Sequence, residues 1–476
     1  MNKYYFILVF FLLTACISAH PWKPSHYVII DTDGGIDDMR AISMFLASPD
    51  VRVLAIVASS GALSAENSYL KVRSLLNSFY HEGIPVGINR RGNFKSPELK
   101  TALNTKWGNE SGITPQKAKD ALELISWVFS AEKTKITFVS LGGLTTARAA
   151  LNEIPSFSQQ VKEIVWSADG LSDTKGFNYS IDKKAADDIL KGSIPVRIIK
   201  PAGDKKFYDK ALVESISKIN NVYAGKISEL FSAGAADGHE FVLASTDETV
   251  PLFLHYPALF STVSSGRNSE SQAGDIHPLK EKTMIILKRE TVERNQVVEE
   301  FPDDPSFYHE DIKDYVGEII SKHGIDEWTS GILANELHRH LGVFAIIGVK
   351  MGIRAREYFD TGVDEFMATS FAGSTPPISC FNDGLQVSTG ATPGHGLLKV
   401  INDGLTRPVA EFVYMNRKIR LTLKPDIAEK VTAELKEINF IHGLDSDIYW
   451  ELVRKNSIKY WLSLDRHEIF EIEEIE

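Results

Sequence analysis

The chain has 476 residues, of which 43% are hydrophobic and 24% charged, and its formal net charge is −11. This length is enough for two or more domains with large cores, and the composition is that of a globular protein. The acidic balance excludes general nucleic-acid binding, because such binding needs a basic face. It leaves small uncharged molecules open as ligands.

The first 20 residues predict a lipoprotein-type signal peptide and tether. A short basic start, Met1-Asn2-Lys3, precedes an apolar run over residues 4–13. About ten apolar residues are too few to span a membrane, which needs about twenty. Leu13-Thr14-Ala15-Cys16 then resembles a bacterial lipobox, whose cysteine is lipidated after cleavage. We therefore expect export and a lipid anchor on the periplasmic or cell-surface side; the alternative is a plain secretory peptide with an incidental cysteine.

After this segment, short apolar runs alternate with amphipathic stretches. The predicted strands cover residues 27–30, 52–57, 136–141, 163–166 and 196–199, and the predicted helices cover 39–46, 65–80, 117–129, 144–151 and 183–190. Alternation at this spacing is typical of the α/β class, with a parallel sheet and helices on both faces.

Four carboxylates follow the first of these strands within eight residues. They are Asp31, Asp33, Asp37 and Asp38, with two glycines between them that allow a sharp turn. Such a group repels itself unless a hard cation lies among its oxygens, and Ca²⁺ prefers oxygen ligands. Strand ends of open α/β sheets are also where ligands bind. The alternative is an acidic helix cap, which explains Asp37 or Asp38 but neither Asp31 nor Asp33.

The octapeptide Asp31-Thr32-Asp33-Gly34-Gly35-Ile36-Asp37-Asp38 resembles the N-terminal signature of the inosine-uridine nucleoside hydrolases, which usually has proline where Gly34 stands. Residues 137–145 resemble the strand and loop whose backbone carbonyl binds calcium in that family. Residues 246–253 resemble the segment that carries the last acidic ligand. Together these motifs extend the resemblance over residues 26–322.

The resemblance implies a ligand set and a reaction. It implies calcium held by Asp33, Asp38, Asp247 and the Leu141 carbonyl, Asp33 as general base, Asp37 and Asn178 as substrate-binding residues, and Asp31 as the residue that orients the metal ligands. The implied reaction is calcium-dependent hydrolysis of the N-glycosidic bond of a nucleoside or related riboside. The resemblance also suggests a homo-oligomer.

Three positions depart from the family pattern. Gly61 stands in place of a common asparagine, Gly176 in place of a glutamate, and Thr246 in place of a histidine that can protonate a leaving base. His239 and Tyr179 are candidate replacement acids, although each is more often an ordinary surface or packing residue. The departures leave open a riboside-binding lipoprotein that has lost catalysis, and hydrolysis of an unusual riboside.

A different pattern begins at residue 323, where Gly324 predicts a helix stop. Residues 315–321 are expected to form the last helix of the first domain. Beyond, His338-Arg339-His340 precedes a predicted helix over residues 343–359, and Cys380 precedes an Asp-x-x-Gln stretch and a Thr-Gly-x-Thr turn. This order resembles the FmdE family, which takes its name from formylmethanofuran dehydrogenase. We therefore expect a smaller α+β domain over residues 323–476, with a β-like run over 409–423.

The second domain contains a candidate transition-metal set. His338 and His340 are two residues apart, so both would face one side of an extended segment. With Cys380 they supply nitrogen and sulfur ligands suited to Zn²⁺ or another transition metal. Many relatives have Cys-Pro-Gly where Gly342-Val343-Phe344 stands, and a second cysteine where Ala391 stands. The alternative is two satisfied histidines and an inert buried thiol.

Overall fold

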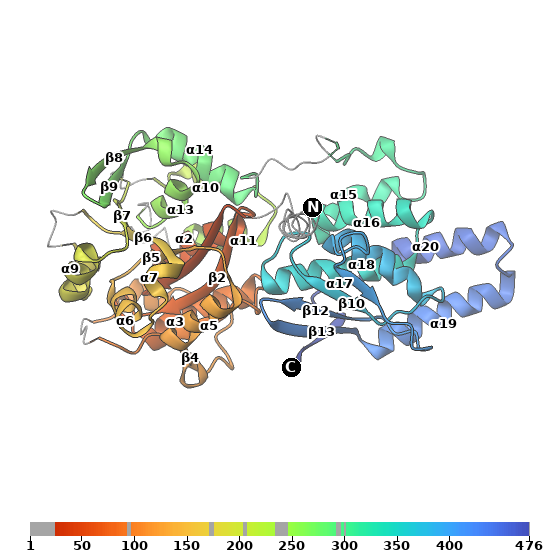
Figure 1. Ribbon diagram of the computed structural model, residues 1–476. Helices are drawn as coiled ribbons and strands as arrows, with labels where there is room; N and C mark the ends of the chain where they lie inside the picture. The colour runs from red at the N-terminus through yellow and green to blue at the C-terminus, as the bar shows by residue number, and fades with distance from the viewer. Residues whose placement is uncertain are drawn as a thin grey trace, which may run out of the picture.

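Two β-sheets, each packed with its own helices, organise the chain (Figure 1). The structure is a computed structural model, and it describes residues 24–92, 97–170, 176–202, 207–233, 246–291, 297–298 and 301–475. The first sheet belongs to the N-terminal part of the chain and has nine strands, and the second belongs to the C-terminal part and has five.

The nine-stranded sheet has the strand order β4-β3-β2-β1-β5-β6-β7-β9-β8. Its strands are β1 (His26–Thr32), β2 (Val51–Ala58), β3 (Val86–Ile88), β4 (Lys119–Asp120), β5 (Ile136–Ser140), β6 (Val161–Ser167), β7 (Val196–Ile199), β8 (Phe260–Ser265) and β9 (Asn268–Ala273). All neighbouring strands run parallel except β8 and β9, which form an antiparallel pair at one edge. The predicted α/β class is confirmed, although the sequence did not predict the β8–β9 pair.

Helices cover both faces of this sheet, and β1 explains why. Its residues are buried on alternate sides, so Val28 and Ile30 join one apolar core while Ile29 joins the other. One face carries residues of α2 (Ile36–Ala47), α3 (Ala65–Ser78), α10 (Lys210–Ile216), α11 (Val222–Ala233), α13 (Thr249–His255) and α14 (Ile276–Leu287). The other carries residues of α5 (Ala121–Ala131), α6 (Thr145–Glu153), α7 (Phe157–Gln160) and α9 (Lys183–Lys191).

One predicted helix begins later than expected. The helix predicted over residues 117–129 begins at Ala121, because Asp120 caps it by accepting a hydrogen bond from the Leu122 amide at 2.9 Å. The residues before it form a 3₁₀ turn, Pro115–Lys117, and the short strand β4. Apolar periodicity alone does not locate the capping residue at which a helix begins.

The second domain is a five-stranded sheet with helices packed against it, as the predicted α+β class requires. Its strand order is β11-β10-β12-β13-β14, and only the β10–β11 pair is parallel. The strands are β10 (Met367–Ser370), β11 (Leu398–Val400), β12 (Val409–Tyr414), β13 (Arg417–Leu423) and β14 (Phe470–Ile475). The helices are α16 (Ile325–His338), α17 (Val343–Phe359), α18 (Phe381–Thr389), α19 (Pro425–His442) and α20 (Asp447–Ser463). The β-like run is thus a hairpin of two strands.

Helix α15 (Val316–His323) ends at Gly324, which has a φ of +87°. We expected this helix to close the first domain. Instead its apolar residues Val316 and Ile319 pack with Trp328 of α16 and Trp461 of α20. The apolar face of the helix thus meets the second core, and the boundary at residues 322 and 323 stays a prediction.

The two domains share a polar contact near the start of β2. Arg52 is buried, and its guanidinium donates to Glu365 Oε2 at 2.8 Å and to the Asp360 carbonyl at 2.6 Å. On the next connection, the Gly83 amide donates to the Tyr358 carbonyl at 2.8 Å. These contacts fix the second domain against the first.

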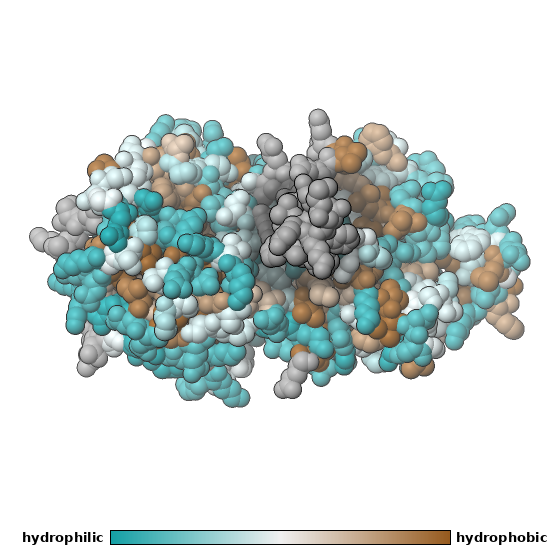
Figure 2. Space-filling view, in the orientation of Figure 1, coloured by the Kyte–Doolittle hydropathy of each residue, from teal (hydrophilic) through white to brown (hydrophobic). Residues whose placement is uncertain are grey.

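The visible surface of the first domain is mostly hydrophilic (Figure 2). Hydrophobic residues occur at the projecting end of α19 and α20, where Phe440, Ile441 and Leu444 are exposed. Among the residues that the structure describes, no helix has the length and apolar character needed to cross a membrane.

Candidate active site

Three acidic side chains meet at the carboxyl end of β1. Asp37 and Asp38 lie in the first turn of α2, and Asp247 lies two residues before α13. One carboxylate oxygen from each of the three lies within 4.8 Å of the other two. Asp38 and Asp247 are buried. Residues far apart in sequence thus form one acidic cluster.

Hydroxyl and amide groups hold these carboxylates in place. Asp38 Oδ1 accepts hydrogen bonds from Thr32 Oγ1 at 2.6 Å and from the Asp33 amide at 3.1 Å. Asp247 Oδ1 accepts one from Ser167 Oγ at 2.5 Å. In both residues it is Oδ1 that is anchored, so the orientation of each carboxylate is set by the protein.

The charges of this cluster are poorly compensated by the protein itself. Burial, and then the charge of Asp37, raises the pKa of Asp38 to about 6. Burial and the charges of Asp37 and Asp38 raise the pKa of Asp247 well above its usual value. Buried carboxylates that repel one another are stabilised by a cation bound among them. The donor set, which is made of hard oxygens, fits Ca²⁺.

Asp33 lies beside this cluster but is not part of the three-carboxylate group. Its carboxylate packs against two glycines, since an added Cβ would lie 2.0 Å from Asp33 Oδ2 at Gly61 and 3.0 Å from it at Gly142. Asp33 Oδ2 is buried and has no hydrogen-bond partner among the described residues. Burial, and then the charge of Asp38, raises the Asp33 pKa well above its usual value. This oxygen is therefore free to accept a hydrogen bond from a bound molecule.

Asp31 lies behind the cluster, near the end of β1. Its Oδ1 accepts a hydrogen bond from Thr146 Oγ1 at 3.0 Å, and burial raises its pKa to about 8. Thr146 in turn accepts a hydrogen bond from Asn89 Nδ2 at 2.8 Å. This chain of contacts is consistent with an orienting role and with no direct role in substrate binding.

Asn178 connects the ends of β5 and β6 by hydrogen bonds. Its Nδ2 donates to the Leu141 carbonyl at 2.7 Å and to the Ser167 carbonyl at 2.9 Å. Both amide hydrogens are therefore used, and only its Oδ1 remains as an acceptor. The carbonyl predicted to bind calcium is thus held by the residue predicted to bind ribose.

The structure gives physical reasons for two departures from the family pattern. Gly34 has a φ of +81°, which proline, with its φ fixed near −65°, does not adopt. Thr246, at the position of the expected histidine, donates a hydrogen bond from its hydroxyl to Asp37 Oδ2. The backbone turn at Gly34 therefore cannot hold the proline of the motif, and a threonine hydroxyl contacts Asp37 where the motif implies a histidine.

The departure at Gly176 brings in a residue that the sequence did not point to. An added Cβ at Gly176 would lie 2.4 Å from Asp169 Oδ2, so the Asp169 carboxylate fills the space beside this glycine. Asp169 is exposed and follows β6 by two residues. Of the two candidate acids, Tyr179 donates its hydroxyl to Asp187 at 3.0 Å. His239 lies outside the described residues.

Two families of known proteins match different parts of this chain. Residues 28–271, which are just over half of the chain, match the inosine-uridine preferring nucleoside hydrolase family. The chain belongs to this family. Residues 337–470 match FmdE, described as molybdenum formylmethanofuran dehydrogenase operon, so this nucleoside hydrolase family member also contains an FmdE domain.

Each curated relative matches this chain over only part of the length of both proteins. The pyrimidine-specific ribonucleoside hydrolase RihA of Salmonella paratyphi A is 31% identical over 187 residues, which are 36% of this chain and 58% of that protein. An uncharacterized protein of Schizosaccharomyces pombe is 27% identical over 183 residues, 36% of this chain and 59% of its own length. The match thus spans less than two thirds of these curated relatives.

Solved structures of nucleoside hydrolases also match part of this chain. A plant nucleoside hydrolase is 20% identical and covers 56% of this chain and 99% of its own, with a TM-score of 0.44. The inosine-uridine preferring nucleoside hydrolase of Bacillus anthracis is 17% identical and covers 56% of this chain and 100% of its own, also with a TM-score of 0.44.

In the FmdE domain, His338 pairs with an acid that sequence reasoning did not single out. His338 Nδ1 lies 2.9 Å from Asp383 Oδ2, and hydrogen bonds to Asp383 and Cys380 raise the His338 pKa to about 9. The rings of His338 and His340 lie 4.2 Å apart. Within the described residues, however, His338, His340 and Cys380 are not among the groups whose ligand atoms converge within 4.8 Å.

The expectation that both histidines sit on an extended segment was wrong. His338 is the last residue of α16, and Arg339 adopts a left-handed conformation with a φ of +73°. His340 instead packs edge-on against Trp450 at 4.9 Å, and burial, followed by the charge of His338, lowers its pKa to about 4. Residue spacing alone could not reveal a helix that ends between the two histidines.

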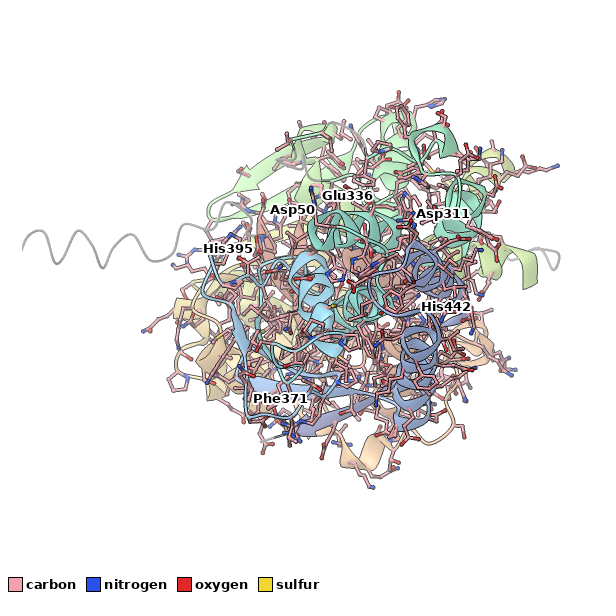
Figure 3. All side chains as sticks on the ribbon, turned by 90° about the vertical axis from the view of Figure 1, so that its right-hand side faces the viewer. Asp50, Asp311, Glu336, Phe371, His395 and His442 are labelled. Atoms are coloured by element: carbon pink, nitrogen blue, oxygen red, sulfur yellow. The ribbon has the colours of Figure 1, made fainter. Side chains whose placement is uncertain are left out.

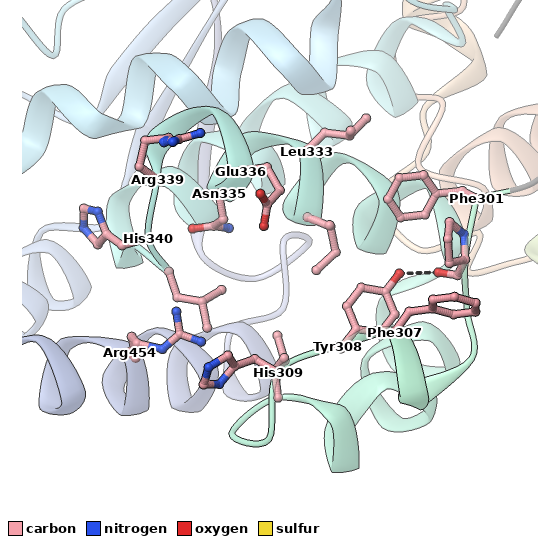
Figure 4. Close-up of a pocket in the computed structure, with 14 residues that line it drawn as sticks. Phe301, Phe307, Tyr308, His309, Leu333, Asn335, Glu336, Arg339, His340 and Arg454 are labelled. Atoms are coloured by element: carbon pink, nitrogen blue, oxygen red, sulfur yellow. Dashed lines mark hydrogen bonds between the residues drawn. The ribbon is translucent and has the colours of Figure 1, made fainter. Parts of the chain in front are cut away.

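A pocket of about 730 Å³ opens next to His340 (Figure 4). Arg339, His340 and Arg454 lie at one side of it, and Phe307 and Tyr308 lie at the other. Arg454 is held by Asp311 at 2.6 Å. This pocket is lined by residues of α16, of α20 and of the segment before α15, and it shares no residue with the acidic cluster.

Proposed function

We propose that the chain is an exported, lipid-anchored hydrolase that cleaves the N-glycosidic bond of a nucleoside or related riboside and depends on calcium. The observation that carries the proposal is the convergence of the Asp37, Asp38 and Asp247 carboxylates within 4.8 Å in a member of the nucleoside hydrolase family. Export and the lipid anchor are proposed from residues 1–16, which resemble a lipoprotein signal peptide ending at Cys16 and lie outside the described residues.

The calcium ligands in this proposal are Asp33, Asp38, Asp247 and the Leu141 carbonyl. Asp38 and Asp247 are already close, and the Leu141 carbonyl keeps one lone pair after it accepts the Asn178 hydrogen bond. Calcium, when bound, would supply the positive charge that polarises a water and holds vicinal hydroxyls of the sugar.

The chain's own groups would perform the proton transfer and bind the sugar. Asp33 Oδ2 would accept the proton of the attacking water, because this oxygen is buried and has no hydrogen-bond partner among the described residues. Asp37 would accept a hydrogen bond from a ribose hydroxyl in place of Thr246. The nearby carboxylates would stabilise the positive charge that develops on the sugar as the bond breaks.

We further propose that Asp169 replaces the acidic side chain missing at Gly176. Its carboxylate lies 2.4 Å from the position of a Cβ at that residue, at the carboxyl end of β6 where the substrate would bind. An acceptor for a sugar hydroxyl would thus come from a residue earlier in the same connection between β6 and residue 177.

Ribose release from a panel of nucleosides and ribosyl conjugates tests the hydrolase. Wild-type protein should release ribose from at least one member, and Asp33→Ala should abolish release. Asp188→Ala is the control, since Asp188 is exposed on α9. Release by Asp33→Ala at the wild-type rate would contradict the proposal.

A second candidate is a riboside-binding lipoprotein that has lost catalysis. The specific observation in its favour is Thr246, which carries no titratable group at the position of the expected acid. Calorimetry separates the two functions: tight riboside binding without ribose release from any panel member would favour the binding protein. Release from an uncommon riboside alone would identify a hydrolase with an altered leaving group.

A further inference from the structure

Two histidines and an aspartate, which are residue types that can bind metals, meet at the end of β1 opposite the acidic cluster. His26 is the first residue of β1, Asp50 lies just before β2, and His255 is the last residue of α13. One ligand atom from each lies within 4.8 Å of the other two. The two imidazole rings are 5.4 Å apart and meet edge to face. Asp50 is labelled in Figure 3, which views the molecule from the side of the second domain.

The carboxylate of this group is held in place by the backbone. Asp50 Oδ1 accepts a hydrogen bond from the Ser25 amide at 2.8 Å, and the Asp50 carbonyl accepts one from the His26 amide at 3.2 Å. Asp50 Oδ2 lies 3.9 Å from His255 Nδ1, which is beyond hydrogen-bond distance. One oxygen is therefore anchored and the other faces a histidine.

Both histidines have unsatisfied nitrogens. His26 Nδ1 and His255 Nε2 are buried and have no hydrogen-bond partner among the described residues. The His255 side chain is only 5% exposed. A buried polar atom without a partner destabilises a fold, so the hydrogen-bonding capacity of both imidazole rings is left unfilled by the described residues.

The protonation states suit a metal. Burial lowers the pKa of His255 to about 4 and also lowers that of His26. Two charged neighbours of His26, Lys162 and Glu163, act in opposite directions on its pKa. Both rings are therefore neutral near pH 7, which is the form in which histidine binds metals.

We propose that His26, Asp50 and His255 bind a transition-metal dication such as Zn²⁺. Two imidazole nitrogens and one carboxylate oxygen are a common zinc ligand set, in which water completes the coordination. Nitrogen ligands disfavour Ca²⁺, which takes oxygen ligands, so this site is chemically distinct from the acidic cluster. The inference does not depend on the proposed hydrolase activity.

An ion at this site would connect the start of β1 to the end of α13. β1 begins at His26 and ends beside Asp33, while α13 begins just after Asp247 and ends at His255. An ion at this site joins the two elements at the ends far from the acidic cluster. Zinc should therefore raise the thermal stability of the first domain without entering the acidic cluster.

Zinc titration of the full mature chain tests the proposal. The protein is stripped with a chelator, saturated with Ca²⁺ and titrated with Zn²⁺, while its melting temperature is followed in parallel. His26→Gln and Asp50→Asn should each weaken zinc binding at one site at least tenfold and abolish the zinc-induced rise in melting temperature. His277→Gln is the control, because His277 is exposed and outside this group.

Circular dichroism establishes that each variant is folded, and His255→Gln serves as a third variant. Loss of one equivalent of zinc in the site variants, but not in the control, supports the proposal. Zinc isotherms that are the same in wild type, His26→Gln and Asp50→Asn would overturn it, because all bound zinc would then belong to other groups.

Discussion

The carboxylate of Asp33 fills the space that a side chain at Gly61 would need. An added Cβ at Gly61 would lie 2.0 Å from Asp33 Oδ2, 2.6 Å from its Cγ and 2.7 Å from its Cβ. The departure from the family pattern at residue 61 is therefore linked to the placement of the predicted general base. In this chain, the loop after β2 accommodates Asp33 and provides no polar side chain at that point.

Gly61→Ala should displace the Asp33 carboxylate and so lower ribose release by about a hundredfold, since a misplacement near 1 Å has effects of this size. The melting temperature should also fall, because the added Cβ would lie 2.7 Å from Asp33 Cβ, which rotation of the carboxylate does not move. The matched control is Gly317→Ala, where an added Cβ meets nothing within 4 Å. Wild-type turnover by Gly61→Ala would contradict the assignment of Asp33 as base.

Asp169→Asn should reduce kcat/KM for ribose release by about ten- to a hundredfold, which is the expected loss of one charge-assisted hydrogen bond. Asp169 is exposed, so the stability of the variant should equal that of wild type. Asp187→Asn, which removes a charge but keeps an oxygen acceptor for the Tyr179 hydroxyl, is the control. Equal kinetics of Asp169→Asn and Asp187→Asn would show that Asp169 has no role in binding sugar.

Arg52→Met should destabilise the contact between the domains by about 3 kcal/mol, because it leaves the mostly buried Glu365 carboxylate without its cationic partner and with only the Gly362 amide as a donor. Urea denaturation measures this loss. Lys455→Met removes an exposed ion pair with Glu451 and should cost less than about 0.5 kcal/mol. If both variants lose equally little, the contact at Arg52 does not hold the domains together.

The His338–Asp383 pair should make stability depend on pH. The pKa of His338 is about 9 in the folded protein and about 6.5 in an unfolded chain, so its stabilisation is complete below pH 6.5 and is lost as pH rises through 9. Urea denaturation with a chelator present, compared between wild type and Asp383→Asn, measures the difference. A difference that does not shrink above neutral pH would argue against a protonated His338.

Much of the first domain follows from local sequence. The predicted strand over residues 196–199 has the observed bounds, and so does the predicted helix over 343–359 of the second domain. The strand formed by β1 and the turn after it were recognisable because apolar β-branched residues precede a cluster of carboxylates. These features depend on neighbours in sequence, and for that reason the pattern predicts them well.

What the sequence missed depends on contacts between distant segments. Asp383 reaches His338 only because α18 packs against α16. Asp169 is close to Gly176 in sequence, but no motif links the two residues. Likewise, His26, Asp50 and His255 carry no shared motif and meet only after β1 and α13 are placed in the fold. Spacing along the chain has no information about such pairs.

The most direct test of the central claim is calcium content and ribose release measured on one sample. The protein is prepared from about Pro21 onward, dialysed without chelator, and assayed for bound metals and for turnover of the nucleoside panel. The account predicts about one calcium per chain, held by carboxylates that include Asp38 and Asp247, and ribose release that stops when calcium is removed. A chain that binds no calcium, or that releases ribose equally well with excess chelator, would contradict it.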